Sequence, residues 1–131
     1  MTDSLTSMIG PVLVRLPPAP ALSRVLRLAA SGIAAMAGFT VDETEDIKIA
    51  VSEVLLALIE HGSGGPIEVQ FSVEDQLFMV RGETEFVGFD VDHPDLVLCR
   101  TVLAGVCAQH GIGLVDDHAQ IWAAVAHASI T

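Results

Sequence analysis

The chain has 131 residues, of which 51% are apolar, and a formal net charge of −11. This length suits one domain with one hydrophobic core. Six basic residues against 17 acidic ones argue against a nucleic-acid-binding face, which needs clustered Lys and Arg. No apolar run approaches the roughly 20 residues of a membrane helix, and residues 1–8 lack the pattern of a secretion signal. We therefore predict a cytoplasmic protein with a flexible leader at 1–8, a single domain at 9–131, and neither a nucleic-acid nor a membrane partner.

The first half of the chain predicts one strand followed by two helices. Residues 10–16 are rich in β-branched side chains and end at a pair of prolines, which is typical of a strand. Apolar residues recur at helical spacing over 22–36, with Gly38 as a C-terminal stop. A second helix is expected over 42–61, with Asp42 as its capping residue. Its apolar stripe is Ile47, Ala50, Val51, Val54, Leu55, Leu58 and Ile59.

The second half predicts a hairpin, a loop, a helix and a final strand pair. Residues 67–73 and 76–82 alternate around a turn at Glu74-Asp75, residues 83–95 show no period, and helical spacing returns over 96–109. Strands at 112–115 and 120–126 are expected to turn at Asp116-Asp117, with Trp122 in the core. This order predicts an α+β fold: a two-layer α/β sandwich whose mixed, mostly antiparallel sheet carries helices on one face.

The cysteines and histidines predict neither a disulfide nor a metal site. Cys99 and Cys107 are eight residues apart in a predicted helix, a rise of about 12 Å that exceeds the reach of a disulfide. Both are therefore expected to be reduced. Four histidines show no ligand spacing: His93, His110, His118 and His127.

Along one flank of the 42–61 helix, Glu53, Ala57 and His61 are four residues apart and share a ridge. Taken alone, Glu53 is typical of a solvated acid at a helix edge. His61 is typical of a helix-terminal residue, where the macrodipole favours a basic side chain.

The run L-R-L-A-A-S-G-I-A-A-M-A-G-F-T-V-D-E-T-E-D-I-K-I-A-V-S-E, residues 26–53, resembles the anti-sigma factor serine kinases of Gram-positive bacteria. These proteins belong to the histidine-kinase-like ATPase (GHKL) superfamily, shared with gyrase B, Hsp90 and MutL. The resemblance is specific over 26–53 and extends more weakly from Val12 to Ala126. It implies a bacterial protein with the histidine-kinase-like ATPase fold.

The family helix carries a motif E-x-x-x-N-x-x-x-H, in which the Glu is the general base and the Asn binds Mg²⁺. By the resemblance, Glu53 matches the Glu and His61 matches the His, whereas Ala57 stands at the Asn position. A methyl group offers no oxygen to Mg²⁺, a cation that takes oxygen ligands. The metal that bridges the phosphates would then lose its anchor to the protein.

Two further family motifs are also altered. In the motif D-x-G-x-G, which reads adenine, Thr84 stands at the Asp position, Phe86 at the first Gly, and only Gly88 is retained. The phosphate-binding motif G-x-G-L reads as residues 93–96, H-P-D-L, where Pro94 has no N–H to donate and an Asp adds negative charge. The lid that precedes this motif in the family is reduced to two residues.

We therefore predict a pseudo-enzyme that keeps the fold and binds a protein partner, either a sigma factor or an anti-sigma antagonist. By the resemblance it is a homodimer, and Arg24 and Arg27 contact carboxylates of the partner. No metal or cofactor is expected. Two alternatives stay open: an active serine/threonine kinase that uses Mg-ATP and Glu53 as base, and a small-molecule sensor that reuses the vacated nucleotide pocket.

Overall fold

The computed structural model describes residues 10–86 and 90–128 and contains the predicted order of elements. The elements are β1 (Val12–Leu16), the short 3-10 turn η1 (Pro20–Leu22), α2 (Ser23–Met36), α3 (Val41–His61), β2 (Ile67–Glu74), β3 (Leu77–Glu85), α4 (Pro94–Val106), β4 (Gln109–Val115) and β5 (His118–Ala126). The leader predicted at 1–8 lies outside the described residues. No helix in the described ranges combines the length and apolarity needed to cross a membrane.

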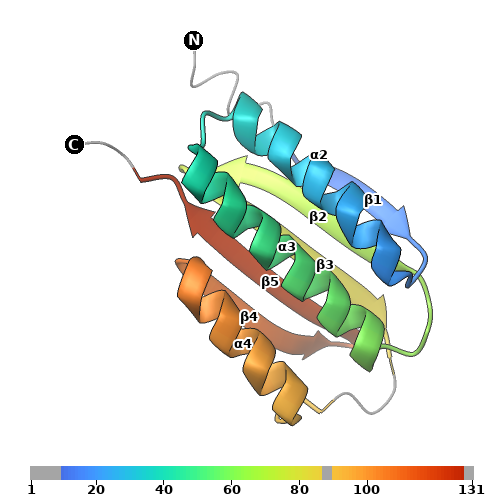
Figure 1. Ribbon diagram of the computed structural model, residues 1–131. Helices are drawn as coiled ribbons and strands as arrows, with labels where there is room; N and C mark the ends of the chain where they lie inside the picture. The colour runs from blue at the N-terminus through green and yellow to red at the C-terminus, as the bar shows by residue number, and fades with distance from the viewer. Residues whose placement is uncertain (1–9, 87–89, 129–131) are drawn as a thin grey trace.

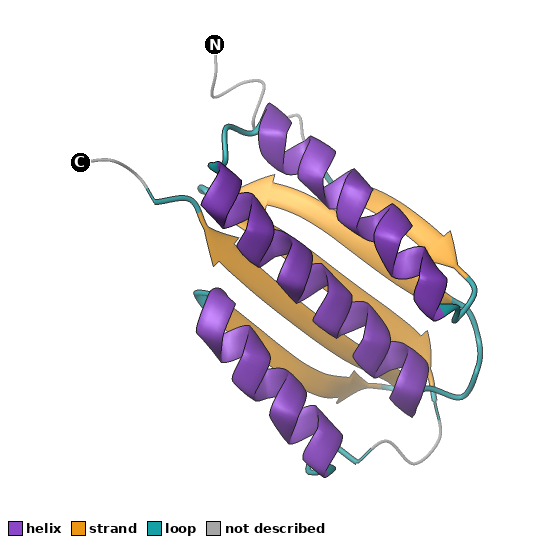
Figure 2. Ribbon diagram, viewed as in Figure 1, coloured by secondary structure: helices purple, strands orange, loops and turns teal. Residues whose placement is uncertain are grey.

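The strands form one five-stranded sheet in the order β1-β2-β3-β5-β4, and each pair of neighbours is antiparallel. Helices α2, α3 and α4 lie side by side across one face of this sheet, with α3 in the middle (Figures 1 and 2). The predicted α+β, two-layer architecture is therefore confirmed, and all pairings between the described strands are antiparallel.

Helix α3 begins one residue earlier than its acidic run suggested, because Thr40 and not Asp42 is its cap. The Glu43 backbone N–H donates to Thr40 Oγ1 at 3.1 Å, and the Thr40 backbone N–H donates to Glu43 Oε1 at 2.8 Å. This reciprocal pair is a capping box, which satisfies two backbone donors that the helix leaves unpaired. Asp42 lies in the first turn, where its charge still suits the helix dipole.

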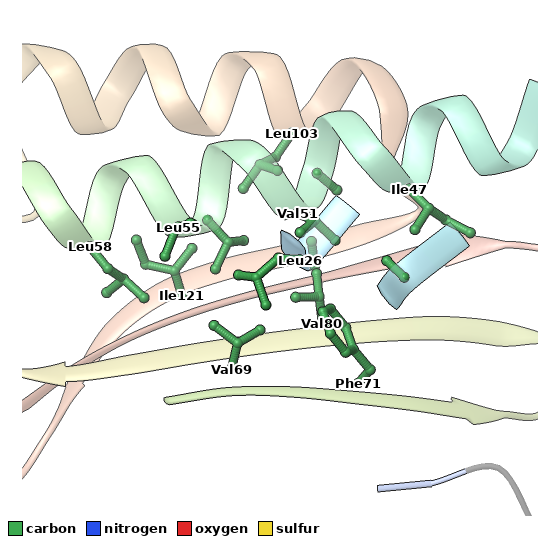
Figure 3. Close-up of a cluster of buried hydrophobic side chains, with 14 of the residues drawn as sticks. Leu26, Ile47, Val51, Leu55, Leu58, Val69, Phe71, Val80, Leu103 and Ile121 are labelled. Atoms are coloured by element: carbon green, nitrogen blue, oxygen red, sulfur yellow. The ribbon is translucent and has the colours of Figure 1, made fainter. Parts of the chain in front are cut away.

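The core lies between the three helices and the sheet, with α3 contributing the most buried residues of the helices (Figure 3). The predicted stripe of α3 is buried as expected, except that Ile59 is only half-buried. Val54 and Leu58 pack directly on Gly82 of β3: a Cβ added at Gly82 would lie 2.6 Å from Leu58 Cδ1 and 2.8 Å from Val54 Cγ1. Only a residue without a side chain lets the helix approach this closely, so Gly82 sets the distance between α3 and the sheet.

Several predicted boundaries shift by one to three residues, including the starts of β4 (predicted at 112, observed at 109) and β5 (predicted at 120, observed at 118). The first hairpin turns at Asp75 and Gln76, one position later than predicted, because these two residues take the positive φ angles (52° and 61°) of a two-residue turn. Helix α4 spans Pro94–Val106 and not 96–109, since Pro94 suits the first turn and Cys107 is already extended. The turn predicted at Asp116-Asp117 is confirmed.

Trp122 was predicted to lie in the core, and this prediction is wrong. Strand alternation turns Ile121 and Ala123, both 0% exposed, toward the helices, so the half-buried Trp122 lies on the opposite, open face of the sheet. Its indole ring covers Gly111 of β4, where an added Cβ would collide with the ring. The indole thereby covers part of the open face at the edge strand.

Candidate functional site

The predicted ridge of Glu53, Ala57 and His61 lies on α3, in the half of the helix that leads to its C-terminus. Ala57 is 6% exposed and belongs to the hydrophobic core cluster. Its side chain is a methyl group packed among apolar neighbours, so this position offers no oxygen to a cation. His61 is the last residue of the helix, as predicted.

Glu53 is half-buried beside α4, which packs against this stretch of α3. The Cys99 Sγ of α4 lies 3.9 Å from the Glu53 carbonyl oxygen. Burial, together with the negative charge of Glu60, raises the pKa of the Glu53 carboxyl above its ordinary value. A raised pKa brings a carboxyl closer to the range in which it accepts and releases protons near neutral pH, the property that a general base needs.

The residues aligned with the adenine-reading motif are turned into the protein. Thr84 is 2% exposed, and its hydroxyl donates to the Pro66 carbonyl oxygen at 3.0 Å. Phe86 is 7% exposed and belongs to the core cluster, so it fills space where the resemblance places a glycine beside the nucleotide. Gly88, the retained glycine of this motif, lies outside the described residues.

The segment aligned with the phosphate-binding motif starts α4. His93 is the N-cap, and its Nδ1 accepts a hydrogen bond from the Asp95 backbone N–H at 3.1 Å. Pro94 at the first helical position has no N–H, and the Asp95 carboxylate adds negative charge in the first turn. An anion at this helix end would therefore meet an acid and one fewer N–H donor than the usual helix N-terminus provides.

A tight turn precedes α4 where the family carries its lid. The Asp92 backbone N–H donates to Asp90 Oδ1 at 3.0 Å, and the His93 backbone N–H donates to the Asp90 carbonyl oxygen at 3.1 Å. Arg100 Nη2 donates to the Val91 carbonyl oxygen at 2.8 Å and ties this turn to α4. The described part of the segment, residues 90–93, is thus a short turn fixed by hydrogen bonds.

The structure brings together three side chains that sequence spacing did not connect: His61, His93 and Asp95. We call them the histidine–aspartate cluster. The rings of His61 and His93 have centroids 4.8 Å apart, and His61 Nε2 lies 3.8 Å from Asp95 Oδ2. Because His61 is 32 residues before His93 in the chain, only the packing of α4 on α3 reveals the cluster.

The two arginines predicted to bind a partner have different surroundings on α2. Arg24 is exposed, whereas Arg27 is half-buried and bridges two helices. The Arg27 Nη1 donates to Ser52 Oγ of α3 and to Ser23 Oγ of its own helix, both at 3.1 Å. Arg27 therefore joins α2 to α3, and Arg24 alone projects freely from this helix.

The chain resembles known proteins in sequence and in structure. No family model matches the chain. The serine-protein kinase RsbW of Bacillus subtilis is 36% identical over 89 residues, which cover 63% of this chain and 56% of the relative. The protein of the same name from Bacillus velezensis is 32% identical over 98 residues, covering 70% of this chain and 61% of the relative. The chain thus spans less than two thirds of the length of either relative.

Two solved structures share the fold. A crystal structure of the RsbU and RsbW domains of a Mycobacterium tuberculosis protein matches 89% of this chain and 32% of that chain, with a TM-score of 0.69 and 16% identity. The Acinetobacter baumannii histidine kinase AdeS matches 98% of this chain and 75% of that chain, with a TM-score of 0.55 and 10% identity. The resemblance predicted from the sequence is confirmed: the chain is similar in sequence to the serine-protein kinases named RsbW and has the histidine-kinase-like ATPase fold.

Proposed function

We propose that the chain is an anti-sigma-factor-like regulatory protein that acts by binding a protein partner, without binding ATP and without kinase activity. The proposal depends mainly on the side chain at position 57. Where the resemblance requires a Mg²⁺ ligand, the helix presents a methyl group that is 6% exposed and packed in the core. Without a protein ligand the metal cannot hold the phosphates of ATP against α3, because positioning and charge neutralisation supply most of the catalysis in phosphoryl transfer.

Four other residues support this proposal, because in the resemblance two of them belong to the adenine-reading motif and two to the phosphate-binding motif. The Thr84 hydroxyl is already bonded to the Pro66 carbonyl oxygen and is buried. The Phe86 side chain fills core space. Pro94 and Asp95 give the start of α4 a missing donor and a negative charge. These features would weaken the binding of adenine and of phosphates in addition to the metal ligand lost at Ala57, so no single compensating change restores the site.

The partner-binding surface that we propose is the outer face of α2 around Arg24. Val25 is 52% exposed and Leu28 is 68% exposed, so two large apolar side chains are exposed within about one helical turn of Arg24. Apolar side chains beside an arginine are a common composition of protein interfaces. A sigma factor or an anti-sigma antagonist with a carboxylate facing Arg24 fits this surface, and a homodimer is part of the same proposal.

Binding of purified candidate partners in the absence of nucleotide tests the proposal. Sigma factors and anti-sigma antagonists of the source organism are mixed with the chain, and complexes are measured by gel filtration with light scattering and by calorimetry. We expect one of them to bind without ATP, and Arg24→Ala to weaken that complex at least tenfold. Arg81→Ala, at an exposed arginine on the open face of the sheet, is the matched control. Absence of any complex, or equal losses in both variants, contradicts the proposal.

An active serine kinase is the second candidate, and the raised pKa of Glu53 is the observation that favours it. The relatives in the two Bacillus species carry the name serine-protein kinase. Transfer of labelled γ-phosphate from ATP to the bound partner, abolished by Glu53→Gln, would establish this activity. If the chain is a pseudo-enzyme, neither the wild-type chain nor Glu53→Gln should transfer phosphate.

A further inference from the structure

The histidine–aspartate cluster lies where the C-terminus of α3 meets the N-terminus of α4. One potential ligand atom from each of His61, His93 and Asp95 lies within 4.8 Å of the other two. The Asp95 Oδ2 is 3.8 Å from His61 Nε2 and 3.8 Å from His93 Nδ1. Ligand atoms around a tetrahedral zinc ion with bonds of about 2.0–2.1 Å are about 3.4 Å apart. Side-chain rotations that shorten the two Asp95 distances by about 0.4 Å, and the remaining distance by at most about 1.4 Å, would therefore complete a three-ligand site.

The two helices hold the ligands at fixed positions relative to each other. Helix α4 is anchored against α3 through Leu96 and Leu103, both 0% exposed, and through the Cys99 contact with the Glu53 carbonyl oxygen. His93 and Asp95 are within one turn of Leu96 in α4, and His61 is three residues after the buried Leu58 of α3. The backbone therefore needs little reorganisation on binding, which reduces the entropy that ordering a ligand set usually costs.

Solvent reaches the cluster. The side chains of His93 and Asp95 are 45% and 62% exposed, so an ion can approach them from water and keep a water molecule in a fourth position. The His61 side chain is 16% exposed and its Nε2 is buried, so this ligand atom lies on the inner side of the cluster. A further carboxylate is near: Glu60 Oε2 lies 4.0 Å from His61 Nε2. Glu60 and Asp95 place negative charge around the two imidazoles, which favours a cation over an anion.

We propose that His61, His93 and Asp95 form a binding site for a divalent transition-metal ion, with Zn²⁺ the best match. Two imidazole nitrogens and one carboxylate are the ligand set of many zinc sites with an open position, whereas Mg²⁺ and Ca²⁺ take oxygen ligands. The site differs from the Mg²⁺ arrangement of the resemblance, which needs an Asn at position 57 and the phosphates of a nucleotide. It uses neither Ala57 nor Glu53.

Metal binding at His93 can compete with the hydrogen bond that caps α4. His93 Nδ1 accepts the Asp95 backbone N–H, and a metal bound at this nitrogen would replace that hydrogen bond. A metal bound at Nε2 of the same ring would leave the cap intact. Bound metal would in both cases link the end of α3 to the start of α4, so zinc would stabilise the contact between these helices.

The test is a zinc titration of the untagged full chain in competition with a chromophoric chelator, followed by Co²⁺ absorption spectroscopy. We expect one Zn²⁺ per chain and a Co²⁺ spectrum of low coordination number. His61→Ala, His93→Ala and Asp95→Asn should each weaken binding at least tenfold, and zinc should raise the melting temperature of the wild-type chain only. Circular dichroism checks that the variants fold. His93→Ala also removes the N-cap of α4, whereas Asp95→Asn keeps the shape of the side chain, so Asp95→Asn tests metal binding with less effect on the helix.

Two controls separate this site from loose binding to an acidic surface. His118→Ala removes an exposed histidine on another part of the chain and should leave zinc affinity unchanged. Millimolar Mg²⁺ or Ca²⁺ should not displace the zinc. Absence of stoichiometric binding, or a loss in His118→Ala equal to that in the three cluster variants, would overturn the proposal. Because the readout is metal binding itself, the result is independent of whether the chain binds a partner or a nucleotide.

Discussion

Glu43 joins the beginning of α3 to the segment that follows β5, and its substitution tests this connection. Its Oε1 accepts the Thr40 backbone N–H and contacts His127 Nδ1, both at 2.8 Å. Its Oε2 accepts the Ala128 backbone N–H. One carboxylate, with a side chain 12% exposed, therefore holds together two parts of the chain that are more than 80 residues apart.

The pKa of Glu43 gives the size of this contribution. Burial alone would raise the pKa, but hydrogen bonds from Thr40, Ala128 and His127 outweigh burial and lower it from 4.5 to about 2. A shift of this size corresponds to about 3 kcal/mol of the free energy of unfolding at neutral pH. Because the folded-state pKa is lowered, this contribution is complete above about pH 4.5 and is lost as the pH falls toward about 2.

The variant Glu43→Gln removes the charge and keeps the size of the side chain. Urea unfolding of both proteins at several pH values between about 7 and about 2 should show a difference of about 2–3 kcal/mol at neutral pH that shrinks toward zero in acid. Glu45→Gln is the control, because Glu45 is exposed and pairs with Lys48 on the helix surface, at 2.9 Å. A difference independent of pH, or one no larger than the control's, would refute the reasoning.

Three further predictions concern packing and reactivity. Gly82→Ala should destabilise the fold by about 1–3 kcal/mol in thermal unfolding, because the added methyl group collides with α3, whereas Gly113→Ala has open space and should not. Arg27→Ala should lower stability by about 1 kcal/mol through the lost bond to α3, while Arg24→Ala leaves it unchanged; equal melting temperatures would contradict this assignment. Burial, followed by the negative charge of Glu53, raises the pKa of the Cys99 thiol to about 11. Disulfide reagents at neutral pH should therefore modify Cys99 at least tenfold more slowly in the folded than in the unfolded chain, and equal rates would contradict this prediction.

The fold was predictable because its signals are local. Apolar spacing in α2 and α3, alternation in β2 and β3, and the turn at Asp116-Asp117 each depend on a few neighbouring residues. The cap of α3 shows how far such signals reach. Both Thr40 and Asp42 are good caps in isolation, and each is followed by a Glu three residues later, so this local pattern does not choose between them. The structure shows that Thr40 and Glu43 form the capping box.

The site was predictable only in part, because its contacts join distant segments. That Ala57 lacks a metal ligand follows from its chemistry alone. That the Thr84 hydroxyl is already bonded to Pro66 depends on the distance between two strands, and that His61 meets His93 depends on how α4 packs on α3. Trp122 shows the same limit, since its hydrophobicity predicts burial while only the strand register reveals which face it takes.

Calorimetric titration of the chain with Mg-ATP and with Mg-ADP tests the central claim most directly. The account predicts no binding at millimolar nucleotide. It predicts the same for Ala57→Asn, because restoring the metal ligand leaves Phe86 in the core and Pro94 at the start of α4. Micromolar binding of either nucleotide by the wild-type chain would contradict the account.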